Sequence, residues 1–104
     1  MFVFTVRVEV EKAHAEQWYD YMTSKHIKDV LETDCFAKAE LEKIISDNEE
    51  TSHFASRYYF ASMDTYNRYL KEFAPQLRTE HNELFGDKVK AERTVSEIKE
   101  YRLI

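Results

Sequence analysis

The stretch Glu16–Leu31, EQWYDYMTSKHIKDVL, decides how the rest of the chain is read. Its composition favours a helix, but at about 100° per residue its earlier and later apolar groups point about 160° apart. The earlier group, with the preceding residue, is Ala15, Trp18, Tyr21 and Met22, and the later group is Ile27, Val30 and Leu31. A straight helix cannot bury both groups on one side. Either the segment breaks or kinks near residues 24–26, or it is sandwiched between its own sheet and another surface, and in both cases His26 lies at the seam.

Four stretches around this segment alternate with the period of two that is typical of strands with one buried face. They are Phe2–Val10, Phe36–Ser46, Thr51–Ala61 and Val89–Leu103, and the middle two form a hairpin around the polar tip Asp47–Glu50. Helices over residues 13–31 and 62–85 complete the order β-α-β-β-α-β. We therefore predict an α+β, ferredoxin-like fold, in which both helices cover one face of a four-stranded antiparallel sheet.

The second helix carries its own start, bend and stop signals. Ser62 can cap its N-terminus, and Gly86, the only glycine, can end it in a left-handed conformation. Pro75 should bend the helix while projecting from the face opposite its apolar stripe. That stripe is formed by Tyr66, Tyr69, Leu70, Phe73, Leu77 and Leu84. The bend is expected to wrap the stripe around the sheet.

The sheet face opposite the helices is not purely polar, whichever set of alternating residues it carries. It retains residues such as Val3 or Phe2, Ile44 or Ile45, and Tyr58 or Tyr59. A partly apolar open face in a short chain is most readily buried against a second copy. We therefore predict a homodimer through the open sheet face, a dimeric α+β barrel.

Length, charge and composition exclude several classes of protein. The chain has 104 residues, 43% of them apolar, which is enough for one core, so we predict one domain over residues 1–104. The net charge is −5 and no basic patch is present, so nucleic acid is not an expected partner. No window approaches the ~20 apolar residues of a membrane span, and the first ten residues do not read as a signal sequence. We expect a cytoplasmic protein without a membrane partner.

His26 is the candidate catalytic residue, because it lies at the seam of the first helix and imidazole can act as a base near neutral pH. A pocket between the helices and the sheet would bind a small molecule. The residues predicted to bind it are Trp18, Met22, His26, Arg57, Tyr59, His81 and Arg93. The alternative is structural: His26 caps a helix end at the break, and His81 is a half-buried polar residue satisfied by a neighbour.

The sequence contains no motif for metal binding, phosphate binding or nucleophilic catalysis. The sequence contains no HxxxH, HExxH or CxxC spacing, and Cys35 is its only cysteine, so we predict no metal site and no disulfide within the chain. A single glycine cannot build a phosphate-binding loop or a dinucleotide fingerprint, and no nucleophile elbow is present. We therefore predict no cofactor.

Several segments of the chain follow one pattern. They are Trp18 with Tyr21, Met22 and His26-Ile27; Phe73-Ala74-Pro75, Leu77-Arg78 and Glu80-His81; Phe85-Gly86-Asp87; and Arg93-Thr94-Val95. In these segments the chain resembles a bacterial family of about this length, a domain of unknown function related to the dimeric α+β barrels. The resemblance implies the fold and dimerisation but no activity. The chain departs from the family pattern at Lys28, where relatives have proline, and at Asp34, where they tend to have glycine.

Two functions from different classes follow. The first is a homodimeric module, without assigned catalysis, that holds a small apolar or aromatic ligand. The second is a cofactor-free enzyme of the dimeric α+β barrel kind, an oxygenase or isomerase, that uses His26 with Arg57 or a tyrosine. A cavity with His26 and Arg57 or Arg93 pointing into it would favour the enzyme, whereas a filled cleft would remove its site.

Overall fold

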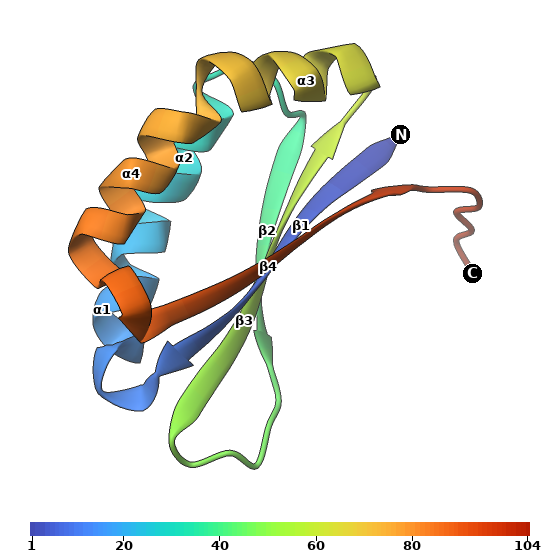
Figure 1. Cartoon of the computed structure of the whole chain (residues 1–104). Coiled ribbons are helices and arrows are strands. Elements are labelled where there is room, and N and C mark those ends of the chain that lie inside the picture. Colours follow the sequence, from blue (N-terminus) through green and yellow to red (C-terminus); the bar gives the residue numbers. More distant parts are fainter.

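All 104 residues are described by the computed structural model. Four strands, β1 (Phe2–Glu11), β2 (Lys38–Ile44), β3 (Thr51–Phe60) and β4 (Val89–Glu97), form one sheet in the order β2-β3-β1-β4. Each neighbouring pair is antiparallel. Figure 1 shows every helix on one side of this sheet and the opposite face bare. The predicted ferredoxin-like arrangement is confirmed.

The first helical arm changes its winding without breaking. After a 3₁₀ turn (Lys12–His14), α1 (Ala15–Tyr21) continues into a π turn (Met22–His26) and then into α2 (Ile27–Leu31). His26 has helical angles, φ −61° and ψ −49°. A π turn takes one extra residue, so it rotates the following residues by about 100°. This rotation returns the later apolar residues to the sheet, and Trp18 and Val30 are both buried.

The second helical arm is two helices rather than one bent helix. α3 (Met63–Glu72) ends at Phe73, whose angles of φ −123° and ψ −41° leave the helical region, and α4 (Ala74–Phe85) restarts beyond it. Pro75 lies in the first turn of α4, where its missing N–H is not needed. The restart changes the phase of the apolar stripe. Leu84 is therefore 54% exposed, contrary to the predicted stripe, and Phe85 is buried instead.

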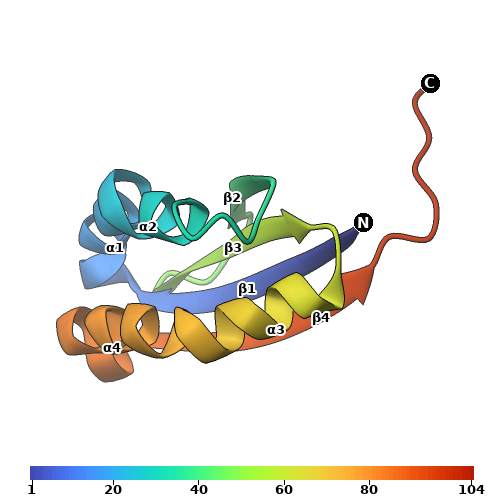
Figure 2. The same cartoon turned by 90° about the horizontal axis from the view of Figure 1, so that it is seen from above.

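The predicted ends of this arm are confirmed. The hydroxyl of Ser62 accepts a hydrogen bond from the backbone N–H of Thr65 at 3.4 Å, which caps α3. Gly86 ends α4 with a positive φ of +52°, but its ψ of −127° lies outside the left-handed helical region that was predicted. In Figure 2 the two arms run side by side as two rows of helix over the sheet.

The core lies between the sheet and these two arms, and it consists of two clusters. Even-numbered residues of β1 and β3 face the helices, so Phe4, Tyr58 and Phe60 pack with Tyr69 in the larger cluster. The smaller cluster packs Trp18, Met22 and Phe54 against the other end of the sheet. The sequence had left open which set of alternating residues faces the helices.

The last strand is shorter than predicted. β4 ends at Glu97, which lies opposite Phe2 at the beginning of β1, so no neighbouring strand is available to pair beyond it. Ile98 donates one more backbone hydrogen bond, to the carbonyl of Met1 at 2.9 Å. Residues 99–104 then project away from the sheet (Figures 1 and 2), and the side chains of Tyr101 and Leu103 are exposed. No helix in the structure combines the length and hydropathy needed to cross a membrane.

Candidate functional site

A cavity of about 50 Å³ lies where the two helical arms meet the centre of the sheet. Its walls are mostly apolar and come from both core clusters, including Phe4 of β1, Trp18 of α1, Met22 of the π turn and Leu77 of α4. Its polar residues are His26, Ser56, Arg78, His81 and Arg93, and Tyr58 and Tyr69 add phenol hydroxyls to otherwise apolar walls. Because one water needs about 10–15 Å³ of such a cavity, about three to five waters would fill it.

Five of the seven predicted site residues meet at this cavity. Trp18, Met22, His26, His81 and Arg93 all line it, although they come from the first arm, α4 and β4. Arg57 and Tyr59 do not, because odd-numbered residues of β3 point to the opposite face of the sheet. There Arg57 pairs with Glu42 and the Tyr59 hydroxyl donates to Glu40. The sheet therefore separates these two residues from His26.

His26 is largely buried and its side chain makes no hydrogen bond. Its Nδ1 atom is fully buried without a partner, and its ring lies 5.7 Å from the ring of Tyr21 and 6.1 Å from that of His81, between centroids. Burial, helped by neighbouring His81, lowers the pKa of His26 to about 4. The imidazole is therefore neutral at pH 7. The alternative that His26 caps a helix end is wrong, because the helix continues through it and its side chain caps nothing.

His81 is held by a hydrogen-bonded chain. The indole Nε1–H of Trp18 donates to His81 Nε2 at 2.9 Å, and His81 Nδ1 lies 3.5 Å from the side-chain oxygen of Asn82. An imidazole nitrogen that accepts a hydrogen bond is unprotonated, so His81 is neutral with its proton on Nδ1. Burial lowers the pKa of His81 in the same sense. His81 is thus a half-buried residue satisfied by its neighbours, and it also lines the cavity.

Two buried tyrosine hydroxyls are poorly satisfied. That of Tyr21, which lies beside His26, has no partner, and that of Tyr58, which lines the cavity, has only a marginal contact with Ser56. Burial raises the pKa of both phenols, so both stay protonated and can donate. Buried polar groups in proteins are nearly always hydrogen-bonded, so the unpartnered His26 Nδ1 and Tyr21 hydroxyl each call for an explanation.

The sequence had not assigned three polar lining residues to the pocket: Ser56, Tyr69 and Arg78. Tyr58 was one of the tyrosines that the enzyme hypothesis offered as a polar partner of His26. Arg78 could have been found from helix spacing, because it lies three residues before His81 and so shares a face of α4 with it. Ser56 carried no signal beyond its place on the same face of β3 as Phe54 and Tyr58.

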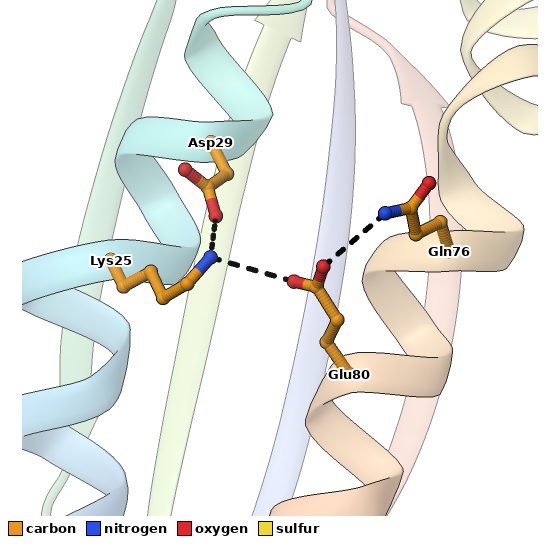
Figure 3. A network of polar contacts seen from close by, with 4 residues as sticks. All are labelled: Lys25, Asp29, Gln76 and Glu80. Atoms are coloured by element: carbon orange, nitrogen blue, oxygen red, sulfur yellow. Dashed lines mark hydrogen bonds and ion pairs between the residues drawn. The ribbon is translucent and has the colours of Figure 1, made fainter.

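An ionic network joins the two arms beside the cavity. Lys25 of the π turn lies 2.5 Å from Asp29 of α2 and 3.5 Å from Glu80 of α4, between Nζ and carboxylate oxygens. Gln76 donates to the other oxygen of Glu80 at 3.5 Å (Figure 3). Lys25 and Glu80 directly precede His26 and His81 in the chain. The network therefore connects the two helix segments that carry both histidines.

No group of three His, Cys, Asp or Glu side chains converges in the structure as a metal site would require. The family model described as "Domain of unknown function (DUF4286)" matches residues 1–99. The chain belongs to this family. No curated protein matches it in sequence.

Solved structures resemble this family member in fold across nearly the whole chain. A dimeric ferredoxin-like protein from an uncultured marine organism aligns with a TM-score of 0.74 at 12% identity, covering 100% of both chains. HapK from Hahella chejuensis aligns with a TM-score of 0.70 at 6% identity, covering 100% of this chain and 99% of its own. A variant of SnoaB, a cofactor-independent oxygenase from Streptomyces nogalater, gives 0.69 at 12% identity, covering 96% and 95%. At these identities the comparisons show the ferredoxin-like fold.

Proposed function

We propose that this chain is a homodimeric α+β barrel protein whose helix–sheet cavity binds a small aromatic or apolar molecule carrying a hydrogen-bonding group. The observation that carries the proposal is the buried, unpartnered Nδ1 atom of His26, on a residue that lines the cavity. The Tyr58 hydroxyl, whose only side-chain neighbour for a hydrogen bond is Ser56, lines the same cavity. A ligand with a hydrogen-bonding group would satisfy the imidazole nitrogen and could accept from the phenol. The aromatic and aliphatic walls would hold its apolar part.

The size of the cavity limits how such a ligand fits. Pockets for drug-sized ligands are about 300–1,000 Å³, several times the volume found here. A ligand larger than a few waters must therefore displace wall residues or part the two helical arms. Two polar links cross that gap, the Trp18–His81 hydrogen bond at 2.9 Å and the Lys25–Glu80 contact at 3.5 Å. The Lys25–Glu80 contact joins partly exposed side chains and is therefore weak, so parting the arms mainly requires the Trp18–His81 bond to open.

Trp18 gives a direct test, because it is the only tryptophan and it lines the cavity. Titration with small aromatic compounds should change its fluorescence and saturate. A Met22→Phe variant would narrow the cavity from the same arm and should weaken binding, whereas Met63→Phe, on the exposed first turn of α3, should not. Native mass spectrometry of the isolated protein would report any retained molecule. No saturable signal with any compound, and no retained molecule, would refute the binding proposal.

The dimer is proposed through the open face of the sheet. Two solved structures of similar fold are described as dimeric ferredoxin-like proteins. The open face is more charged than expected, but its charges lie opposite one another in register: Arg7 with Glu92, Glu9 with Lys90, and Arg57 with Glu40. Such pairing limits the repulsion that a net charge of −5 would otherwise cause between two copies. The exposed apolar side chains of residues 99–104 would gain cover from the partner.

Sedimentation velocity tests the dimer. The wild-type chain should sediment as a dimer at tens of micromolar. Ile44→Glu places a charge on the open face and should shift the chain toward monomer, while Ile45→Glu, at a position already 90% exposed beyond the strand, should not. A monomeric wild-type chain at this concentration would contradict the proposed assembly.

The second candidate function is cofactor-free enzyme chemistry with His26 as the base. It is favoured by one observation, an unprotonated imidazole with a free Nδ1 on a residue that lines the cavity. SnoaB, of similar fold, is described as a cofactor-independent oxygenase. A pKa of about 4 makes His26 a weak base, so only a substrate that yields a stabilised anion would react.

Deuterium exchange into an enolisable aromatic diketone, 1-phenyl-1,3-butanedione, tests this chemistry. The wild-type chain should speed exchange over buffer, and His26→Gln should remove the acceleration while leaving Trp18 fluorescence quenching by the diketone in place. Binding without any acceleration would leave the ligand-binding function and remove the enzyme.

A further inference from the structure

Two guanidinium groups at the cavity lack any acidic partner. Arg78 of α4 and Arg93 of β4 both line the cavity, although they come from different layers of the fold. The ion pairs of the structure use Lys25, Lys99 and two other arginines, and neither Arg78 nor Arg93 takes part in an ion pair or a side-chain hydrogen bond. The chain has 20 acidic residues against 15 basic ones, so this lack is not a shortage of carboxylates.

The two arginines act on the same small region. Burial lowers the pKa of Arg93, and the nearby charge of Arg78 lowers it further. Burial raises the pKa values of Tyr66 and Tyr69, and both arginines oppose that rise. The positive field therefore reaches two phenol groups that can themselves donate hydrogen bonds. The result is a cluster of donors with uncompensated positive charge.

We infer that the cavity takes a small organic carboxylate, whose anionic end lies between Arg78 and Arg93 and whose aromatic or aliphatic body lies against Trp18 and Met22. This inference rests on the ligand-binding function proposed above and names the chemical class of the ligand. A planar carboxylate accepts paired hydrogen bonds from a guanidinium, and such charge-assisted bonds are stronger than neutral ones. The apolar walls next to the arginines favour an acid with a hydrophobic body over a hydrated inorganic anion.

The positions of Arg78 and Arg93 in the fold also explain why the repulsion between their positive charges does not destabilise the chain. Arg93 lies on an edge strand and remains exposed to solvent on one side, and Arg78 is half-buried on α4. Solvent therefore reaches and screens both charges. A bound carboxylate would replace this solvent and offset the repulsion between the two guanidinium groups, so the site is electrostatically suited to an anion.

The experiment compares benzoate with benzamide, its uncharged near-isostere, and with inorganic phosphate. Trp18 fluorescence measures the dissociation constant of each for the wild-type chain. Benzoate should bind at least about tenfold more tightly than benzamide, because only benzoate forms charge-assisted bonds with the arginines. Its affinity should fall as salt rises. Phosphate should not compete with benzoate at equal concentration.

Arg78→Gln and Arg93→Gln should each weaken benzoate binding by about tenfold or more and leave benzamide binding within about twofold. Lys71→Gln removes one positive charge from the exposed face of α3 and is the matched control, with benzoate affinity unchanged. Both arginine variants should also keep or raise the thermal midpoint without ligand, because each removes a like-charge contact. A structural role for the arginines would instead lower the midpoint.

The outcomes separate the inference from the function on which it rests. Equal binding of benzoate and benzamide overturns the carboxylate inference while the ligand-binding function stands. Phosphate that displaces benzoate shows a general anion site and also overturns the assignment to carboxylates. If neither aromatic compound nor any other causes a saturable change in Trp18 fluorescence, the ligand-binding function itself fails.

Discussion

Acid should destabilise the folded chain through its buried histidines, and most strongly through His26. A histidine whose pKa is lower in the folded state than in the unfolded state stabilises the fold fully only above the unfolded pKa. That stability is lost as the pH falls through the window between the two values. For His26 the window runs from the ordinary 6.5 down to about 4. Between pH 7.5 and pH 4.5 this single group should remove about 2.5 kcal/mol from the free energy of unfolding.

The groups around His26 set the sign of this effect. Burial and His81 lower its pKa, whereas Asp29 and Glu80 raise it and Lys25 lowers it. Because burial is the largest of these, replacing the imidazole by an apolar group should remove the pH dependence. His26→Leu also removes a buried unpartnered nitrogen, so it should not lower stability at pH 7.5.

Urea unfolding followed by circular dichroism, at one fixed protein concentration, measures this difference. Wild type and His26→Leu are compared at pH 7.5, 6.0, 5.0 and 4.5, so that carboxylates and the other histidines cancel between them. The wild-type curve should fall below the variant by a gap that widens to about 2.5 kcal/mol. Parallel curves would refute the reasoning, because they would mean that His26 is protonated with equal ease in the folded and unfolded chains.

Four further outcomes follow from local geometry. Acidification should break the hydrogen bond from the indole N–H of Trp18, because a protonated His81 Nε2 cannot accept it. The NMR chemical shift of this N–H should therefore change as the pH falls below 6.5. An unchanged chemical shift would contradict the hydrogen bond. Asp34 has φ +61°, so Asp34→Gly should raise stability by about 0.5 kcal/mol in thermal unfolding, and a loss would show that its side chain matters. Ser62→Ala should cost about 1 kcal/mol through the lost cap, with Ser62→Asp as the conserving control. Gly86→Ala should cost about 1–2 kcal/mol from backbone strain alone, since nothing lies within 4 Å of the added methyl; an unchanged midpoint would refute this.

The order of strands and helices could be predicted because its signals are local. Alternation along residues 2–10 and 51–60, a capping Ser62 and a terminal Gly86 each act within a few residues. The face of the sheet that meets the helices was not predictable in the same way. Tyr58 and Tyr59 are adjacent, so both faces of β3 carry an aromatic residue, and only tertiary packing decides between them. Arg57 and Tyr59 were expected near the cavity for this reason.

The buried face of α4 was predicted wrongly for a different reason. Residue spacing predicts which face of a helix a residue lies on only while the helix is continuous. The break at Phe73 changes the direction in which the following residues point. Leu84 was therefore predicted on the buried face that Phe85 occupies. In the first arm the same rule was informative, because the mismatch between Trp18 and Val30 indicated either a change of winding or burial of the helix on two sides. The form of the change, a π turn, needed the structure.

The π turn also bears on how variation would act on the site. Substitution within Met22–His26 exchanges side chains but keeps their directions. Removal of one residue would restore ordinary α-helical winding, because the π turn holds one residue more than an α turn. The residues after the deletion would then keep their directions, and Val30 would stay against the sheet. Deletion of Ser24, whose exposed side chain does not line the cavity, should therefore preserve the helix face that the following residues present to the sheet.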